Sequence, residues 1–532
     1  MPERMQTTMN SRIALKPHAL AVPMPFQGHI QPLLSLSLKL VSAGFMVTFA
    51  STHTNHQRIT VHRIENGTTT QEDKAGGDLS FVSLGEELVV ERDLPLDTVT
   101  EMFKLVVRAA VARLLARLNE KGPPVSLLLF DFRLVYVLDL AIAAGIPITE
   151  IFFSFRIQRY MRRNSHNCAV KIADESIRFT CAEGVPPLTC KEITGVFLGS
   201  MQPPFPSDEF AWLPFRRVKE PTWTVISGFE ELEATTLDII QEMTGFRPLA
   251  LGPLINAPSF TICEGVSATS LQSHLDWLQM HPKHSVLYIA FGTFATISEM
   301  QLEELVLGLE ANEQPFIWVF RGNLCAQTKG YTLESLSRRL GMQGLLVPWA
   351  SQRDVLSHPS VGGFLTHCAW NSTIEAINAG VPMLTWPVFV DQLLNRRCIV
   401  EQWGMGLDFD PSDSTGQLIT RTEVEKKVRA LMQAKAGEQM REKAKNWSNV
   451  AQRAYEEKGS SLKRFNCRLS NDSIVSRRRY GAFIQIRCFD MAIIDLDYIH
   501  KSILFNFAQF KSTISCIPSL KKPMLQNVAG WK

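Results

Sequence analysis

The 532-residue sequence lacks long apolar segments and unusual composition. No run of 18 or more apolar residues is free of charge; the nearest, residues 492–510, is interrupted by Asp495, Asp497 and Lys501. That pattern argues against a membrane-spanning helix. The apolar run near the amino terminus is short and broken by prolines, unlike a secretory signal. With 31 Gly and 28 Pro, both near average abundance, the chain is neither collagenous nor largely disordered. We therefore expect a globular protein without stable membrane insertion.

The chain also has no large excess of charge of one sign and no closely spaced pairs of cysteines. The chain has 55 basic and 52 acidic residues, a net charge of +3, and residues 467–532 alone hold ten basic and four acidic residues. This balance gives no general signature of nucleic-acid binding. The ten cysteines show no CxxC or CxxxxC spacing, which argues against a zinc ribbon or a dense disulfide framework. We expect reduced thiols, a cytoplasmic location and no nucleic-acid partner.

Short apolar runs alternate with helical patterns along most of the chain. Residues 19–24 form a strand pattern, Pro32 suits the first turn of a helix that ends at Gly44, and residues 45–50 form a second strand pattern. Strand, helix and strand within about 35 residues are typical of a βαβ unit. Related strand and helix patterns recur at residues 125–130, 140–144, 146–153, 222–227, 229–242, 286–291, 315–320, 344–347, 363–366 and 382–386.

These patterns predict an α/β protein with two doubly wound, Rossmann-like halves. A polar, proline-containing segment that begins at Gly252 separates the two series. In such folds, ligands bind at the carboxyl ends of the strands and in the cleft between domains. The predicted parts are a disordered amino terminus (1–16), an N-terminal domain (17–252), a linker (253–270), a C-terminal domain (271–466) and an atypical tail (467–532).

The segment 349–392 is the richest in chemistry. Residues 362–366 form a strand pattern and residues 367–370 a turn, after which Asn371 and Ser372 are predicted as a helix N-cap. The unpaired N–H groups at such a helix start bind anions, so this turn suits a phosphate without a metal. The structural alternative for the same pattern is a capped surface helix above a buried tryptophan.

Side chains around this turn suit the other parts of a nucleotide sugar. Glu375, one turn into the helix, is an acceptor for ribose hydroxyls. Trp349 and Trp370 offer flat apolar faces for a base or a sugar. Asp391 and Gln392 supply acceptors and donors for sugar hydroxyls.

Polar residues also follow two strands of the N-terminal half. His29 follows the first strand pattern and begins a helix, whose positive end disfavours imidazolium and favours a neutral, proton-accepting ring. Asp131 follows the strand pattern 125–130. In a doubly wound sheet both side chains reach one cleft. The alternative is a purely structural histidine, and we interpret Asp139 as a structural helix position.

The stretch 349–392 closely resembles the 44-residue signature box of plant family-1 UDP-dependent glycosyltransferases. The patterns W-A-x-Q, H-x-x-W-N-S-x-x-E and D-Q all fall in register. Weaker similarity extends over roughly residues 17–466 and includes PFQGHIQP, GFEELE, LGPL and GSSLKRF. The resemblance implies the GT-B fold, in which two Rossmann-like domains face each other and the C-terminal one holds most of the nucleotide sugar.

The resemblance also implies how UDP would be held. Trp349 would stack on uracil, and Ala350 would bond the base through its backbone. Gln352 and Glu375 would hold the ribose. The diphosphate would be bound by Thr293, His367, Asn371 and Ser372. Because the helix end and His367 would meet the diphosphate charge, the resemblance implies no metal, and no cofactor beside UDP-glucose as donor substrate.

The sugar would lie next to a second set of matching residues. Trp370, Asp391 and Gln392 would bind it, and Ser154 is a further candidate for the sugar 6-hydroxyl. In the family, a glutamine at the last position together with the tryptophan is the usual combination for UDP-glucose. We therefore expect glucose as the transferred sugar.

The implied reaction uses His29 and Asp131 as a catalytic pair. His29 would remove the proton from the acceptor, while Asp131 would orient the imidazole and stabilise its charge. The acceptor oxygen would attack the anomeric carbon, expel UDP and give a β-glucoside. We expect a monomer acting on a small lipophilic acceptor of flavonoid, phenolic or terpenoid type. The alternatives are a UDP-sugar hydrolase or epimerase of the same fold, and a UDP-sugar-binding protein without turnover.

The sequence departs from the family pattern at three places. Ala369 replaces the usual glycine, which would either crowd the phosphate or be harmless. Residues 156–163 hold four arginines, either as a solvated face or as a surface that favours an acidic acceptor. The tail 467–532 matches nothing in the family pattern, and we interpret it as an added element or an artefact of gene prediction. The DxD sequences at 408–410 and 495–497 are interpreted as chance.

Overall fold

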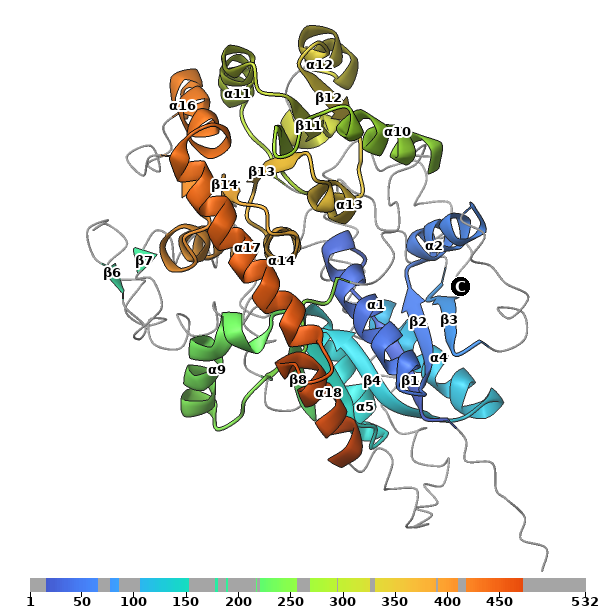
Figure 1. Cartoon of the computed structure of the whole chain (residues 1–532). Coiled ribbons are helices and arrows are strands. Elements are labelled where there is room, and N and C mark those ends of the chain that lie inside the picture. The colour runs from blue at the N-terminus through green and yellow to red at the C-terminus, as the bar shows by residue number, and fades with distance from the viewer. Residues whose placement is uncertain are drawn as a thin grey trace, which may run out of the picture. The chain divides into compact units, whose positions relative to one another are not determined.

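The structure, a computed structural model, describes residues 16–65, 77–85, 106–152, 178–179, 188–189, 217, 221–255, 268–293, 295–325, 331–388, 391–409 and 418–471. The predicted amino-terminal segment up to residue 15, Ser154, the arginine-rich stretch 156–163 and the tail beyond residue 471 lie outside these residues. Two parallel sheets with helices around them make up most of the described part (Figure 1).

The first sheet has seven strands within the described residues, in the order β3-β2-β1-β4-β5-β8-β9. Every neighbouring pair is parallel. Its strands are β1 (His18–Val22), β2 (Met46–Ser51), β3 (Leu79–Ser83), β4 (Val125–Asp131), β5 (Ile148–Phe152), β8 (Trp223–Ile226) and β9 (Leu249–Ala250). Its helices are α1 (Gln27–Ser42), α2 (His53–Glu65), α4 (Arg108–Lys121), the 3₁₀ helix η3 (Phe132–Val137), α5 (Leu138–Ala143) and α9 (Glu230–Thr244). The order reverses between β1 and β4, as in doubly wound folds.

The second sheet is also parallel, with the order β12-β11-β10-β13-β14-β15 in the described residues. Its strands are β10 (Val286–Ala290), β11 (Phe316–Val319), β12 (Gly344–Val347), β13 (Val361–Thr366), β14 (Met383–Thr385) and β15 (Gly406–Asp408). Its helices are α10 (Ala268–Gln279), α11 (Glu299–Asn312), η4 (Gly322–Cys325), α12 (Leu333–Leu340), α13 (Gln352–Ser357), α14 (Trp370–Ala379), α15 (Gln392–Arg397), the π-helix η5 (Cys398–Gln402) and α16 (Arg421–Met432). Here the order reverses between β10 and β13. The two sheets bear out the predicted fold class.

Two final helices connect the halves. The 21-residue helix α17 (Lys435–Tyr455) packs on α14 of the second half and on α9 of the first, and α18 (Ser460–Asn471) packs on β9 (Figure 1). The α18 side chain Phe465 is buried in the core of the first sheet. Neither α17 nor another helix in the described part of the chain is long and apolar enough to cross a bilayer. A separate antiparallel pair consists of β6 (Arg178–Phe179) and β7 (Leu188–Thr189).

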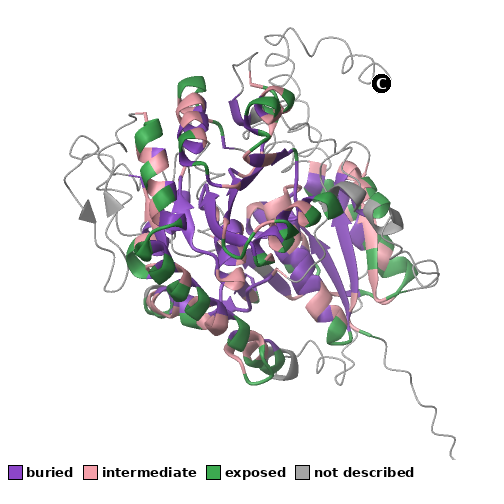
Figure 2. Cartoon of the chain, turned by 45° about the horizontal axis from the view of Figure 1, so that its top comes forward, coloured by how far each residue is buried: buried purple, intermediate pink, exposed green. Residues whose placement is uncertain are grey.

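The central strands are buried along their whole length. All residues of β1, β10 and β13 are buried, whereas the exposed positions gather on the helices (Figure 2). Helices on both faces of a parallel sheet exclude water from both faces, so continuous apolar runs rather than alternating ones form these strands. This explains why the short apolar runs in the sequence are informative.

Two predicted helix starts are wrong. α1 begins at Gln27, so Pro32 lies inside the helix instead of in its first turn. α14 begins at Trp370 with Ala369 as its N-cap, so Asn371 and Ser372 already lie within the helix. Neither helix has a side-chain hydrogen bond at its N-cap, so the side-chain pattern does not mark where it begins.

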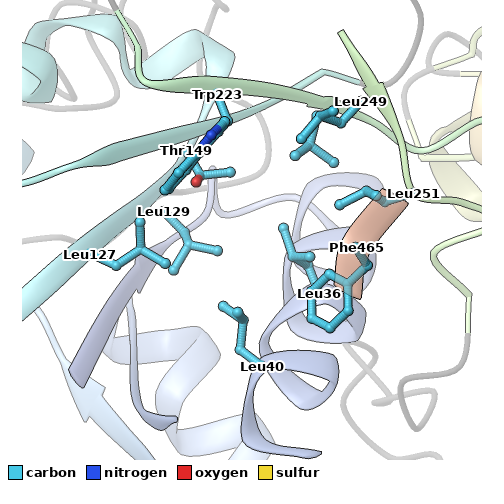
Figure 3. Close-up of a pocket in the computed structure, with 10 residues that line it drawn as sticks. Leu36, Leu40, Leu127, Leu129, Thr149, Trp223, Leu249, Leu251 and Phe465 are labelled. Atoms are coloured by element: carbon cyan, nitrogen blue, oxygen red, sulfur yellow. The ribbon is translucent and has the colours of Figure 1, made fainter. Parts of the chain in front are cut away.

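A small apolar cavity lies between the first sheet, α1 and α18 (Figure 3). Its volume is about 50 Å³, and its lining consists of Leu36, Leu40, Leu127, Leu129, Thr149, Trp223, Val225, Leu249, Leu251 and Phe465. A dry cavity that binds benzene measures ~150 Å³, so this one is too small for an aromatic acceptor. We interpret it as a packing defect in the core next to the Phe465 side chain.

Filling this cavity is expected to stabilise the protein. The change Val225→Ile adds one methylene at a lining position and should raise the free energy of unfolding by about 0.8 kcal/mol. The matched control is Val286→Ile on the fully buried strand β10, which does not line the cavity and should be destabilised by ~1–3 kcal/mol through overpacking. Urea unfolding of both variants provides the measurement. Equal effects in the two variants would contradict the assignment.

Candidate active site

Both sheets carry polar side chains where their strand order reverses. In the first sheet, His29 lies in the first turn of α1 after β1, and Asp131 is the last residue of β4. In the second sheet, Thr293 follows β10 and His367 follows β13. Doubly wound sheets bind ligands at this switch point, beyond the carboxyl ends of the strands. Four of the predicted site residues therefore lie where the topology favours a site.

His29 and Asp131 form a hydrogen-bonded pair. The distance from His29 Nδ1 to Asp131 Oδ2 is 2.7 Å, and Asp131 Oδ1 accepts the backbone N–H of Arg133 at 3.0 Å. Asp131 is fully buried, while 22% of the His29 side chain is exposed. A carboxylate accepts hydrogen bonds, so Nδ1 carries the proton and Nε2 carries the lone pair. The pair is thus arranged to accept a proton at Nε2.

Aromatic rings on two sides fix the plane of the His29 imidazole. Its ring is stacked on Phe132 with centroids 6.4 Å apart and an interplanar angle of 15°. Phe26 meets it edge-on at 5.8 Å. These contacts add to the bond with Asp131 and leave the ring few alternative orientations.

Arg133 is a residue of this site that sequence reasoning missed. Its guanidinium carbon lies 4.6 Å from the centre of the Phe132 ring, a cation–π contact. Its charge acts on the carboxylates of Asp131 and Asp391. Burial lowers the pKa of Arg133 to about 10, so it stays charged at neutral pH. The sequence signal that could have identified Arg133 is a basic residue two positions after an aspartate at the end of a strand.

The predicted ribose-binding residues lie together. Gln352 Nε2 donates to Glu375 Oε2 at 2.7 Å and to Ser372 Oγ at 3.0 Å. The neighbouring Trp349 and Ala350 are both 5% exposed. Burial raises the pKa of Glu375 to about 7, although the bond from Gln352 opposes the rise.

This raised pKa predicts pH-dependent binding of the donor. If a ribose hydroxyl donates to ionised Glu375, affinity falls as pH falls through 7, because protonation removes the acceptor. The Kd of UDP-glucose should rise about tenfold from pH 8 to pH 6. UDP-glucose is the suitable probe because it has no secondary phosphate ionisation in this range. Calorimetric titration provides the measurement, and Glu375→Gln should flatten the profile; a pH dependence that persists in that variant would contradict the assignment.

The turn between β13 and α14 has its backbone strain at Cys368. Cys368 has φ +65°, and its N–H donates to Thr366 Oγ1 at 3.2 Å. Ala369 has φ −62° and ψ 146°, an extended conformation open to any residue, and caps α14 without a side-chain hydrogen bond. The backbone therefore does not require glycine at Ala369, and no capping side chain covers the first N–H groups of the helix.

His367 and Thr293 lie close to the cation Arg321. Thr293 Oγ1 accepts a bond from Arg321 Nη1 at 3.1 Å. Burial, with a smaller contribution from the Arg321 charge, lowers the pKa of His367 to about 4. His367 is therefore neutral at neutral pH and offers hydrogen bonding rather than charge. The positive charge at this position comes from Arg321, a second residue that the sequence patterns did not single out.

The predicted sugar-binding pair adjoins the catalytic pair. Asp391 Oδ2 accepts from Asn395 Nδ2 at 2.9 Å, and the same amide donates to the carbonyl of Cys368. Burial raises the pKa of Asp391, whereas the charges of Arg133 and His29 lower it. Gln392 is 3% exposed, and its Oε1 accepts the backbone N–H of Val388 at 2.8 Å.

One hydrogen bond ties the two halves of the site. Asn371 Nδ2, in the first turn of α14, donates to the carbonyl oxygen of Gly28 in the first turn of α1. Trp370 also approaches the first half, since a Cβ atom added at Gly228 would lie 3.4 Å from its Cζ2 atom. The helix that carries His29 is therefore bonded directly to the turn predicted for the diphosphate.

The remaining predicted positions stand apart from this site. Ser154 lies outside the described residues. Asp408 of the first DxD sequence pairs with Arg396 at 2.9 Å. Asp139 pairs with Arg217 at 2.6 Å and is half exposed. In the part of the chain that the structure describes, no three His, Cys, Asp or Glu side chains gather in a group that could hold a metal ion.

Comparison with known proteins identifies the family of this chain. Residues 230–439 match the family model described as UDP-glucoronosyl and UDP-glucosyl transferase. UDP-glycosyltransferase 85A1 of Arabidopsis thaliana is 31% identical over 479 residues, which cover 85% of this chain and 95% of that protein. The chain belongs to the UDP-glycosyltransferase family. A 7-deoxyloganetin glucosyltransferase of Catharanthus roseus is 28% identical and is covered over 94% of its length.

Solved structures show the same fold as this UDP-glycosyltransferase. The UGT2 structure of Phytolacca americana with UDP-2fluoro-glucose and pterostilbene has a TM-score of 0.68 and 25% identity, and the match covers 85% of this chain and 99% of that one. TcCGT1 in complex with UDP has a TM-score of 0.71 and 26% identity, with 85% and 98% covered. The GT-B fold, the enzyme class and the use of a UDP-sugar follow from these matches.

Proposed function

We propose that this UDP-glycosyltransferase transfers glucose from UDP-glucose to a hydroxyl or carboxyl of a small lipophilic acceptor, with inversion to a β-glucoside. The observation that carries the proposal is the pairing of His29 with the buried Asp131 at 2.7 Å. It adjoins the turn between β13 and α14 through the bond from Asn371 to Gly28. A proton acceptor and a candidate diphosphate turn thus meet at the switch points of both sheets.

The proton would pass from the acceptor to His29. As the acceptor oxygen attacks the anomeric carbon, Nε2 takes its proton and the imidazolium is stabilised by the buried carboxylate of Asp131. The bond between the anomeric carbon and the diphosphate oxygen breaks on the opposite face, and UDP leaves. Attack from one face with departure from the other inverts an α-linked donor to a β-product.

The leaving UDP would be stabilised by groups of the second sheet. The N–H groups at the start of α14 would present a positive helix end to the β-phosphate, and Arg321 beside Thr293 would supply a full positive charge. These groups support a reaction without a divalent metal or a cofactor. We also propose glucose as the transferred sugar, since Trp370 and Gln392 match the combination usual for UDP-glucose.

The acceptor class and cellular setting complete the proposal. Flavonoid, phenolic or terpenoid acceptors are supported by the names of matched proteins, including a glucosyltransferase for 7-deoxyloganetin and a complex with pterostilbene. Widely spaced cysteines support reduced thiols and a cytoplasmic location, and we propose a monomer that acts in plant secondary metabolism.

The test is product analysis with UDP-glucose and a panel of flavonol, phenolic acid and terpenoid acceptors. The expected result is UDP release with a mass gain of one hexose, and a β-configuration in the proton NMR coupling of the anomeric hydrogen. UDP release without an acceptor product would indicate a hydrolase. Binding of UDP-glucose without formation of free UDP would indicate a binding protein. An α-linked product would contradict inversion.

A further inference from the structure

The first turn of α1 has a carbonyl that its own helix cannot use. In an α-helix the carbonyl of residue 28 accepts the N–H of residue 32, but residue 32 is proline, which has no N–H. The Gly28 carbonyl accepts instead the side-chain amide of Asn371. A proline inside one helix thereby leaves an acceptor for a side chain of the other half of the site.

Gly28 also allows the close approach of Asn371. A Cβ atom added at Gly28 would lie 3.1 Å from Asn371 Nδ2, closer than an ordinary van der Waals contact. Gly28 has no positive φ, so it is needed here for space and not for backbone conformation. A methyl group here would require Asn371 to shift by a few tenths of an ångström, whereas a hydrogen leaves the amide its direct path to the carbonyl.

The bond joins two groups with different tasks. His29 follows Gly28 directly and is paired with Asp131 at 2.7 Å, so a movement of the first turn of α1 moves the base. Asn371 lies in the first turn of α14, the turn predicted for the diphosphate. A side-chain amide has two N–H groups, so it can donate to the Gly28 carbonyl and to a phosphate oxygen at once.

We propose that Asn371 couples diphosphate binding to the position of His29 through the Gly28 carbonyl, and that Pro32 and Gly28 are positioning residues that keep this bond available. This inference rests on the proposed function for the roles of the turn and of the base. In the free protein the bond holds α1 against α14. When the diphosphate orders the Asn371 side chain, it also orders the turn that carries the proton acceptor.

Two substitutions test the coupling without weakening α1. Pro32→Ala supplies an N–H that competes for the Gly28 carbonyl, and Gly28→Ala places a methyl group against Asn371. Both raise the helix propensity of α1, so the unfolding temperature should equal or exceed that of the unchanged protein. The kcat should nevertheless fall about tenfold or more, because displacement of a reacting group is costly, while the Kd of UDP should change by a smaller factor.

Hydrogen exchange measures the coupling without turnover. UDP should slow the exchange of the backbone amides of residues 27–31 about threefold or more in the unchanged protein and in the control Pro282→Ala, an exposed turn residue. In Pro32→Ala and Gly28→Ala this slowing should vanish. The proposal is overturned if UDP leaves these amides unaffected in the unchanged protein, or slows them equally in both variants. It is also overturned if the variants lose unfolding temperature and UDP affinity together.

The two proposals fail in different ways. If UDP slows exchange in α1 as expected but no sugar reaches any acceptor, the coupling stands and the proposed function fails. If sugar is transferred and both variants retain full kcat, the function stands and the coupling fails. If UDP does not bind the unchanged protein, both are overturned.

Discussion

Replacing His29 by alanine is expected to reduce the kcat for glucosyl transfer by about 10²–10⁴-fold. The variant loses Nε2, the proton acceptor, and leaves the buried Asp131 carboxylate without the ring bonded to it at 2.7 Å. UDP-glucose affinity should stay within about threefold, because no part of the His29 side chain belongs to the predicted UDP-binding set. Initial rates at saturating donor and acceptor, with donor Kd from calorimetry, provide the two measurements.

A second histidine variant controls for loss of an imidazole as such. His281 lies beyond α10 and contacts the backbone of Trp277 and its ring, and His281→Ala should leave kcat unchanged.

Acceptors with more acidic hydroxyls, and carboxylate acceptors above all, need less help from a base. The loss in His29→Ala should therefore shrink as the acceptor pKa falls. A uniform loss across all acceptors would contradict the role of His29 as a base.

Most of the sheet architecture could be predicted, because a buried parallel strand has a signal in its own local sequence. A strand covered on both faces requires a continuous apolar run, and the runs at 125–130 and 286–291 match β4 and β10 to within a residue. The strand at 344–347 matches β12. By contrast, β3 and β15 went unrecognised, since their burial is mixed and their apolar runs are short. Edge position alone does not explain this, since β12 is also an edge strand but is buried at three of its four residues.

The start of α11 could be predicted from its N-cap Ser298, but the reciprocal half of a capping box could not. Ser298 and Gln301 fit the first half of a capping box, and Ser298 Oγ does accept the Gln301 N–H at 3.2 Å. The Gln301 side chain, however, makes two bonds to the backbone of Ile419 in place of the reciprocal bond. A partner 118 residues away outcompetes a local one, and spacing in the sequence carries no sign of it.

For the site, a strand-end rule located His29, Asp131 and His367 without any three-dimensional information. The rule works because the carboxyl ends of parallel strands share one edge of a sheet. Charge states were not accessible in this way. His367 resembles a cationic phosphate ligand in the sequence, yet burial lowers its pKa to about 4. Arg321 supplies the positive charge beside His367, through contacts between segments far apart in the chain.

Replacing Asp131 by asparagine is expected to lower kcat by about 10²–10³-fold, although the two side chains have almost the same shape. An amide in this position has no negative charge to stabilise the imidazolium. If it presents its NH₂ group to Nδ1, it also forces the proton onto Nε2 and leaves no lone pair for the acceptor proton. The carboxylate is fully buried, so water cannot replace its charge. Steady-state kinetics over pH 6–9 provide the measurement.

The outcome separates charge stabilisation from mere packing. Asp139→Asn is the matched control, because it makes the same change on α5, at a half-exposed residue that pairs with Arg217, and it should leave kcat within about twofold. In Asp131→Asn, kcat should stay reduced throughout pH 6–9, because an amide carries no negative charge at any pH in this range. A kcat that recovers within this range would contradict the role of the Asp131 charge. Full activity in Asp131→Asn would remove it from the mechanism and leave His29 to act without a partner.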